Sequence, residues 1–357
     1  MRKVIIYDND GEIIDFENVG SLESLPIESI NDDILIIKIR RSFHVNFYRF
    51  PNIEKLIEVI KEYGDFNKVL LDFNEIVVDE RGVNELAEAL NKKCFYINFD
   101  MMNNNDIKFT IPHSLYSHIN YILNDDFLSA RNYLDISNKN YKIFLKPHKL
   151  VFFSNNINHV RIDIFNILKS TNNLTNNIWS FNSNSVQYYS HIKHDLNKFL
   201  EENKDILPHS YDNYNLNDEL TFSLAPQYLA YFEIFTESYY FNQILEYEKF
   251  CPVTEKMFKP IITYLPFIVF ASPNLKQSLE NIGLTFESPM YGFYDITNKT
   301  SIKLGLEHVK RQSTMTIKEL HELYYQHVDE FTRNSRIFLD YFIDNRKNFI
   351  HLLNNSN

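Results

Sequence analysis

Apolar runs of strand length alternate along this chain with segments of helical spacing, and this alternation restricts its fold more than any other feature. The strand-like runs Val69–Leu71 and Cys94–Phe99 flank helical spacing over Gly82–Asn91. The alternation returns with the apolar run Lys149–Phe153 and helical spacing over Arg161–Ser170. Such a pattern is typical of an open sheet with helices on its faces. The sequence therefore predicts the α/β fold class.

The length of the chain predicts more than one folding unit. A chain of 357 residues exceeds what a single hydrophobic core usually fills. The segment Lys142–Lys149, with a proline inside it, is a suitable linker. We expect an N-terminal α/β lobe over residues 1–145 and a second Rossmann-like lobe over 146–315. Residues 316–357 have helical spacing and are expected to pack back across the lobes.

Further elements are expected at both ends of the alternation. The segment Lys3–Phe16 has the turn residues of a β-hairpin. In the second lobe, helical spacing over Val253–Tyr264 precedes the apolar run Phe267–Phe270. A helix over Leu275–Asn281, with a glycine where a helix C-cap belongs, is expected to lead into a short strand over Leu284–Phe286.

Charge and cysteine content exclude several classes of protein. A formal charge of −11 argues against a surface that grips duplex nucleic acid as a whole. Cys94 and Cys251 lie far apart, which suggests neither a disulfide framework nor a thiolate zinc site. We find no signal peptide and no apolar run long enough to span a bilayer. A cytoplasmic protein is therefore expected.

The segment around Thr254 has the features of an anion site. Thr254 is a good N-cap, so the helix that follows would present unpaired N–H groups and a positive dipole end. Lys256 and Lys259 share a helix face, where both ammonium groups can reach one diphosphate. Glu255, on a neighbouring face, could accept the hydroxyls of a ribose. The alternative interpretation is a capped amphipathic helix with solvated lysines, which the residues alone do not exclude.

The order of these motifs resembles that of the fucosyltransferases, the glycosyltransferase family 10-like proteins of GT-B fold. The segments Phe235–Ser238, Thr254–Lys256 and Pro266–Phe270 follow one another as the corresponding motifs do in that family. The strand ending in Ser154 and Asn155, followed by Arg161, is similar to the other donor-site element of the family. The resemblance covers roughly residues 149–170 and 231–272, and similar proteins are known from large phages.

The resemblance implies a role for each matching position. Arg161 and Lys256 would hold the diphosphate of a nucleotide-sugar donor, Glu255 would hold its ribose, and Ser154 and Asn155 would line the same crevice. An arginine suits this role because its guanidinium can donate two hydrogen bonds to one phosphate. The predicted donor-binding residues are Ser154, Asn155, Arg161, Glu237, Ser238, Thr254, Glu255, Lys256 and Lys259.

A catalytic base is expected from the first, acceptor-side lobe. Inverting transfer needs a group that takes the proton of the acceptor hydroxyl. Glu75 follows a predicted strand and is the candidate, with Asp72 and Asp100 as rivals at comparable strand ends. A solvated loop acid would give the same pattern at each position. No metal and no cofactor are expected, because Arg161, Lys256 and Lys259 would neutralise the donor phosphates.

The sequence therefore predicts a metal-independent, inverting glycosyltransferase with two Rossmann-like lobes facing a cleft and a glycan hydroxyl as acceptor. Two alternatives remain. The acceptor is a hydroxymethylated base in phage DNA, or the chain is a binding or assembly protein that has kept the fold and lost the activity. The second alternative follows from Lys259 and Pro260, which stand where the family has an Arg-Asn pair. No oligomeric state is predicted.

Overall fold

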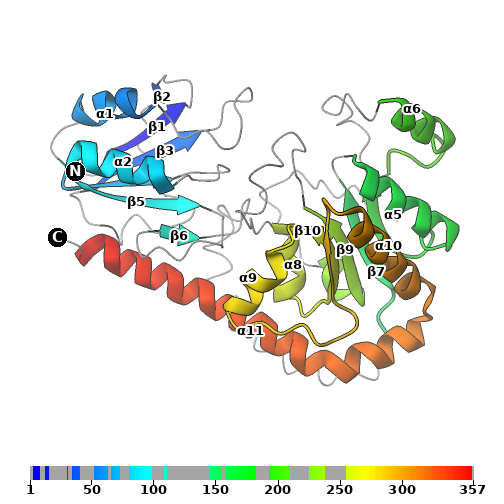
Figure 1. Ribbon diagram of the computed structural model, residues 1–357. Coiled ribbons are helices and arrows are strands. Elements are labelled where there is room, and N and C mark those ends of the chain that lie inside the picture. The colour runs from blue at the N-terminus through cyan, green and yellow to red at the C-terminus, as the bar shows by residue number, and fades with distance from the viewer. Residues whose placement is uncertain are drawn as a thin grey trace. The chain divides into compact units, whose positions relative to one another are not determined.

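A computed structural model of the chain shows two compact units. It describes residues 3–8, 13–15, 30, 34–40, 52–62, 66–72, 80–98, 108–110, 145–154, 157–181, 193–209, 225–237 and 255–355. Unit 1 comprises Met1–Leu128, Phe250–Glu255 and Asp340–Asn357, and unit 2 comprises Ser129–Lys249 and Lys256–Leu339. Each unit is built on a sheet whose strands are mainly parallel (Figure 1). The prediction of an α/β fold with two Rossmann-like lobes is confirmed.

The sheet of unit 1 has the strand order β2-β1-β3-β4-β5-β6. Its strands are β1 (Lys3–Asp8), β2 (Ile13–Asp15), β3 (Ile34–Arg40), β4 (Lys68–Asp72), β5 (Lys93–Asn98) and β6 (Lys108–Thr110). β1 and β2 pair antiparallel, which confirms the predicted hairpin, and the other pairings are parallel. The step from β1 to β2 is this antiparallel hairpin, whereas the described steps from β3 to β6 run in one direction across the sheet.

Both faces of the unit 1 sheet are covered, which explains its nearly continuous apolar strands. The helices α1 (Ile53–Glu62) and α2 (Glu80–Leu90) pack on one face, against side chains such as Leu35 and Leu71. The last turns of the long helix α11 (Ile317–Asn355) cover the other face, where the rings of Phe95 and Phe349 meet with centroids 6.1 Å apart (Figure 1).

The sheet of unit 2 is wholly parallel and has the order β11-β10-β9-β7-β8. Its strands are β7 (Leu150–Ser154), β8 (Ile178–Phe181), β9 (Phe232–Thr236), β10 (Phe267–Ala271) and β11 (Gly292–Asp295). Read from β8 to β11 and numbered along the chain within this unit, the strands come in the order second, first, third, fourth and fifth. The winding direction therefore reverses between β7 and β9, and doubly wound sheets place ligands outside the carboxyl ends of the strands at such a point.

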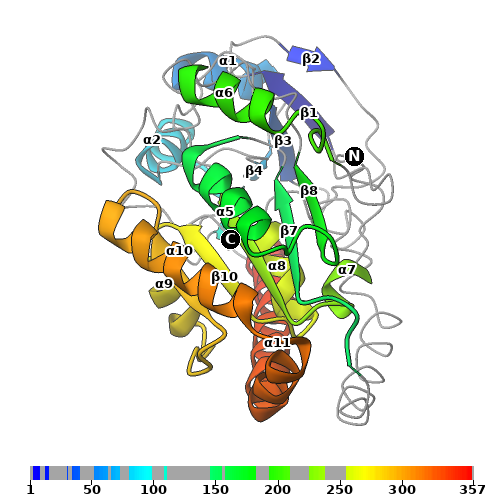
Figure 2. The same cartoon turned by 90° about the vertical axis from the view of Figure 1, so that its right-hand side faces the viewer.

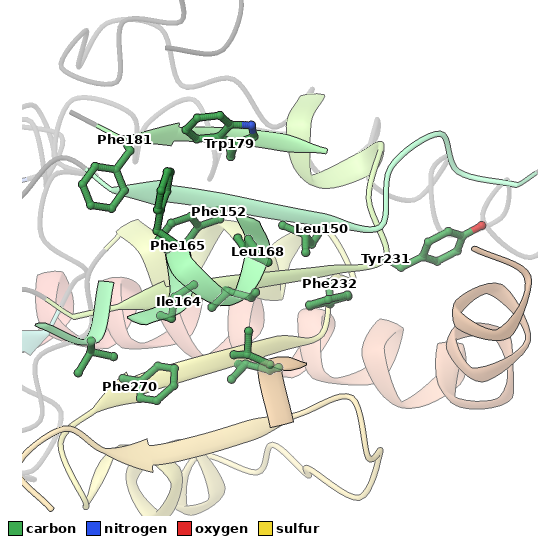
Figure 3. Close-up of a cluster of buried hydrophobic side chains, with 14 of the residues drawn as sticks. Leu150, Phe152, Ile164, Phe165, Leu168, Trp179, Phe181, Tyr231, Phe232 and Phe270 are labelled. Atoms are coloured by element: carbon green, nitrogen blue, oxygen red, sulfur yellow. The ribbon is translucent and has the colours of Figure 1, made fainter. Parts of the chain in front are cut away.

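Helices lie on both sides of the unit 2 sheet (Figure 2). They are α5 (His159–Ser170), α6 (Lys193–Glu202), α7 (Ala225–Tyr228), α8 (Glu255–Ile262), α9 (Leu275–Asn281), α10 (Lys299–Thr314) and α11. The helices α5 and α10 cover one face, where Ile164, Phe165 and Leu168 pack against Phe152 and Phe270 of the strands (Figure 3). The rings of Phe258 in α8 and Phe338 in α11 are 5.4 Å apart, which joins these two helices.

The predicted helix over Leu275–Asn281 is confirmed as α9. Gly283 follows its C-cap with φ of +99°, a left-handed conformation that glycine adopts without steric cost, as expected for the end of a helix. In the part of the chain that the structure describes, no helix is both long and apolar enough to cross a membrane.

The prediction of a strand over Leu284–Phe286 is wrong. The edge strand of this sheet is β11, a few residues later. The backbone N–H and C=O groups of Thr285 bond to the amide side chain of Asn334 in α11. The Glu330 carboxylate accepts the backbone N–H groups of Glu287 and Ser288 at 2.7 and 3.0 Å. Side chains of α11 thus satisfy backbone groups that a neighbouring strand would otherwise bond, and only Leu284 of this segment is fully buried.

Candidate functional site

Polar and charged side chains gather at the carboxyl ends of β7 and β9, where the winding direction of the unit 2 sheet reverses. β7 ends at Ser154, and β9 ends at Thr236, which Glu237 follows directly. Arg161 in α5 and Lys256 in α8 reach this edge from two helices. We refer to Ser154, Arg161, Thr236, Glu237 and Lys256 as the switch-point cluster.

Arg161 owes its position to the way in which α5 begins. The side chain of Asn158 caps the helix, because its Oδ1 accepts the backbone N–H of Arg161 at 2.9 Å. The helix therefore begins shortly after β7 and has Arg161 in its first turn. The buried residues Ile164 and Leu168 hold α5 against the sheet. Arg161 itself is only 3% exposed, although its guanidinium is charged.

The guanidinium of Arg161 meets the last residue of β9. Its Nε donates to the hydroxyl Oγ1 of Thr236, and its Nη2 donates to the backbone oxygen of the same residue at 3.0 Å. Thr236 is as deeply buried as Arg161. A buried charge requires such partners, because it has lost the hydrogen bonds of water. One arginine thereby fixes both the side chain and the backbone at the end of the strand.

Glu237 connects the end of β9 to α8. Its backbone N–H donates to the oxygen of Phe270 in the neighbouring strand at 3.0 Å. Its carboxylate is 1% exposed, and its Oε2 lies 3.8 Å from Nζ of Lys256, whose side chain is 26% exposed. This separation is that of an ion pair and exceeds that of a direct hydrogen bond. A deeply buried carboxylate thus faces a partly exposed ammonium group.

The helix α8 carries a second lysine, Lys259. Lys256 and Lys259 are both partly exposed and lie three residues apart, while Met257 and Phe258 between them are buried. The first N–H groups of a helix have no partner within the helix and favour a negative charge. Arg161 and Lys256 thus bring two cations to the end of β9.

The structure brings together three of the predicted donor-binding residues: Arg161, Glu237 and Lys256. Ser154 is buried at the end of the adjacent strand, and Lys259 lies one turn further along α8. Outside the described residues lie Glu75, Asp100, Asn155, Ser238, Thr254 and the side chain of Glu255. Asp72, a rival for the catalytic base, is buried at the end of β4 in unit 1.

Thr236 is the member of the cluster that sequence reasoning missed. It lies inside the segment Phe235–Ser238, from which only the last two residues were taken as site residues. The available signal was its position directly after Ile234 and Phe235, at the place where a buried strand ends. Among the residues that the structure describes, no three His, Cys, Asp or Glu side chains gather as a metal site requires.

Comparisons with known proteins yield structural neighbours but no family. No protein-family model and no curated protein matches the sequence. An α,α-trehalose-6-phosphate synthase from Burkholderia multivorans is 9% identical, with a TM-score of 0.42, over 90% of this chain and 73% of that chain. A glycosyltransferase from Rickettsia africae is 8% identical, with a TM-score of 0.36, over 96% of this chain and 99% of that chain.

A third neighbour is an α,α-trehalose-phosphate synthase (UDP-forming) from Burkholderia vietnamiensis. It is 10% identical, with a TM-score of 0.33, over 88% of this chain and 67% of that chain. At such identities and TM-scores no residue of this chain can be matched to a residue of those proteins. The function therefore has to be inferred from the side chains of this chain itself.

Proposed function

We propose that the switch-point cluster binds the diphosphate of a nucleotide-sugar donor and that the chain is a glycosyltransferase acting on a hydroxyl acceptor. The observation that carries the proposal is the convergence of Arg161 and Lys256, through Thr236 and Glu237, on one point of the sheet edge. This is the point at which doubly wound sheets bind nucleotides. The motif order, which resembles that of the fucosyltransferases, supports the sugar as the transferred group.

The charges of the cluster suit the chemistry of this reaction. When the bond between sugar and diphosphate breaks, negative charge builds up on the leaving nucleotide. Cations that are already in place stabilise this charge without having to reorganise. The Lys256 side chain is partly exposed and can reach a ligand, and the buried Arg161 adds positive charge at the end of β9. Lys259 would meet the outer phosphate or the nucleoside side of the donor.

Charge reversal of Lys256 tests the proposal. We expect Lys256→Glu to abolish the binding of UDP and GDP in isothermal titration calorimetry, because the variant places a second carboxylate beside Glu237. Lys318→Glu is the matched control, since that side chain is 81% exposed at the start of α11 and lies outside the cluster. Unchanged nucleotide affinity in Lys256→Glu would refute the assignment of the site.

The sugar, the acceptor and the catalytic base stay predictions, as do the inverting course and the independence from metal. Release of nucleotide from a panel of nucleotide sugars would separate an enzyme from a binding protein of the same fold. Transfer assays with oligosaccharides and with hydroxymethylated DNA would then identify the acceptor. A chain that binds nucleotide diphosphates but hydrolyses and transfers nothing would be a binding or assembly protein.

A further inference from the structure

Arg161 directs one edge of its guanidinium at protein atoms. Nε and Nη2 both donate to Thr236, one to its hydroxyl and one to its backbone oxygen. A guanidinium presents these two donors side by side in a rigid plane, so the pair of contacts sets the orientation of the residue that accepts them. The ammonium group of a lysine could reach one of the two acceptors but cannot reproduce the planar fork.

The contact with Thr236 extends to the cation on α8. Thr236 precedes Glu237, whose backbone N–H is itself anchored on Phe270. The Glu237 carboxylate faces Nζ of Lys256 at 3.8 Å. A lysine side chain has four rotatable bonds, and ordering them when a ligand binds costs conformational entropy, which weakens binding. A carboxylate held in a fixed position reduces this loss by keeping the ammonium group near one place.

We infer that Arg161 is a positioning residue, which sets the direction of Lys256 through Thr236 and Glu237. The inference rests on the proposed function, because it assigns Lys256 to the donor diphosphate. The difference in burial supports this division of roles, since Arg161 is 3% exposed and the Lys256 side chain is 26% exposed. The partly exposed Lys256 meets the ligand. The buried Arg161 keeps the end of β9 in place, and Glu237 at that end keeps Lys256 in position.

Three variants separate positioning from direct binding of phosphate. Thr236→Val removes the hydroxyl at nearly constant volume, and Thr236→Ser keeps it. Arg161→Lys keeps the positive charge and loses the fork. Thr332→Val is the matched control, a buried threonine of α11 outside the switch-point cluster. The affinities of UDP, GDP and inorganic pyrophosphate are measured by calorimetry, with Trp179 fluorescence as the check that unit 2 is folded.

If Arg161 positions Lys256, Thr236→Val should weaken binding of the probes by about tenfold, which is the size of effect found between residues in contact. Thr236→Ser should bind the probes nearly as the wild type does. Arg161→Lys should lose as much as Thr236→Val, and the double variant should lose no more than either. If the variants only destabilised the fold, the unfolding temperature would fall. Thr236→Ser would then not restore the affinity for the probes, and the losses in the double variant would add.

Two failures are distinguishable. If the wild type binds the probes, Lys256→Glu abolishes binding and Thr236→Val leaves it unchanged, the positioning role of Arg161 is refuted and the proposed function stands. Arg161→Lys with full affinity would refute it in the same way, because charge alone would then suffice. If the wild type binds none of the probes, the proposed function fails and this inference fails with it.

Discussion

Lys146 should make the stability of unit 2 rise with pH between about 7 and 10.5. Its Nζ donates to the backbone oxygen of Ala230 at 2.7 Å and lies 4.3 Å from the ring centroid of Tyr324. Burial lowers the pKa of this ammonium group from 10.5 to about 7. The perturbation is Lys146→Met, which keeps the length and apolar body of the side chain and removes the titrating group.

The sign follows from proton binding. Between pH 7 and 10.5 the unfolded chain keeps the proton on this lysine, while the folded chain has released it. The unfolded state therefore binds more protons, and the free energy of unfolding rises with pH across this window. Burial raises the pKa of the neighbouring Tyr231 hydroxyl above its ordinary value. Further titratable side chains close by are His321, whose Nδ1 contacts the Tyr231 hydroxyl at 3.0 Å, and Tyr324, whose hydroxyl donates to the backbone oxygen of Tyr264 at 2.9 Å.

The magnitude can be bounded from the environment of Lys146. The difference between 10.5 and about 7 is about 3.5 pH units, and each is worth about 1.4 kcal/mol, so the upper limit is about 5 kcal/mol. The face of the Tyr324 ring and the Ala230 carbonyl favour the charged form and offset about 2 kcal/mol of this. We expect a net rise of about 2–3 kcal/mol between pH 7 and 10.

The assay is urea unfolding followed by tryptophan fluorescence. The chain has one tryptophan, Trp179, and it is buried in β8 of unit 2, so its signal reports this unit. The free energy of unfolding of the wild type minus that of Lys146→Met is measured at several pH values, which cancels the titration of all other groups. Lys318→Met, at a lysine 81% exposed, should follow the wild type at every pH. A difference that is the same at pH 7 and pH 10 would show that Lys146 keeps its proton, and the reasoning from burial would be wrong.

Two further predictions concern the cores of the units. Lys68 is 6% exposed, and its Nζ donates to the backbone oxygens of Leu353 and Asn354 at the end of α11, at 2.8 and 3.2 Å. Lys68→Met should destabilise unit 1 by about 1–3 kcal/mol and speed amide hydrogen exchange in the last turn of α11. Unchanged exchange in that turn would show that Lys68 does not stabilise the end of the helix. In α10, Gly305→Ala places a Cβ 2.5 Å from Cε1 of Phe270, so it should destabilise by about 1–2 kcal/mol in urea titrations, although alanine favours helices elsewhere. A more stable variant would show that the Phe270 ring can move aside.

Much of the fold could be predicted from the sequence, because the relevant signals are local. The buried strands β7 and β10 are short apolar runs, and α9 has a glycine at its end. The same reasoning failed at Leu284–Phe286, where an apolar run lies against α11 and not in the sheet. An apolar run indicates that a segment is buried, but it does not say which element buries it.

The candidate site was predictable only in part. Arg161, Glu237 and Lys256 were identified from motif order, but Thr236, which links the first to the other two, was not. Arg161 and Thr236 are 75 positions apart, and no pattern along the chain indicates that they touch. Their contact depends on β9 pairing beside β7, which is a property of the whole sheet.

The sequence by itself determined which segments become strands and helices and which charges lie at their ends, because periodicity and capping act over a few neighbouring residues. Only the tertiary structure decided the order of the strands, and with it which strand ends are adjacent. That order arises from the packing of helices on both faces of the sheet, a long-range balance of buried area. For this reason the cations could be found in the sequence, whereas the buried contacts that hold them could not.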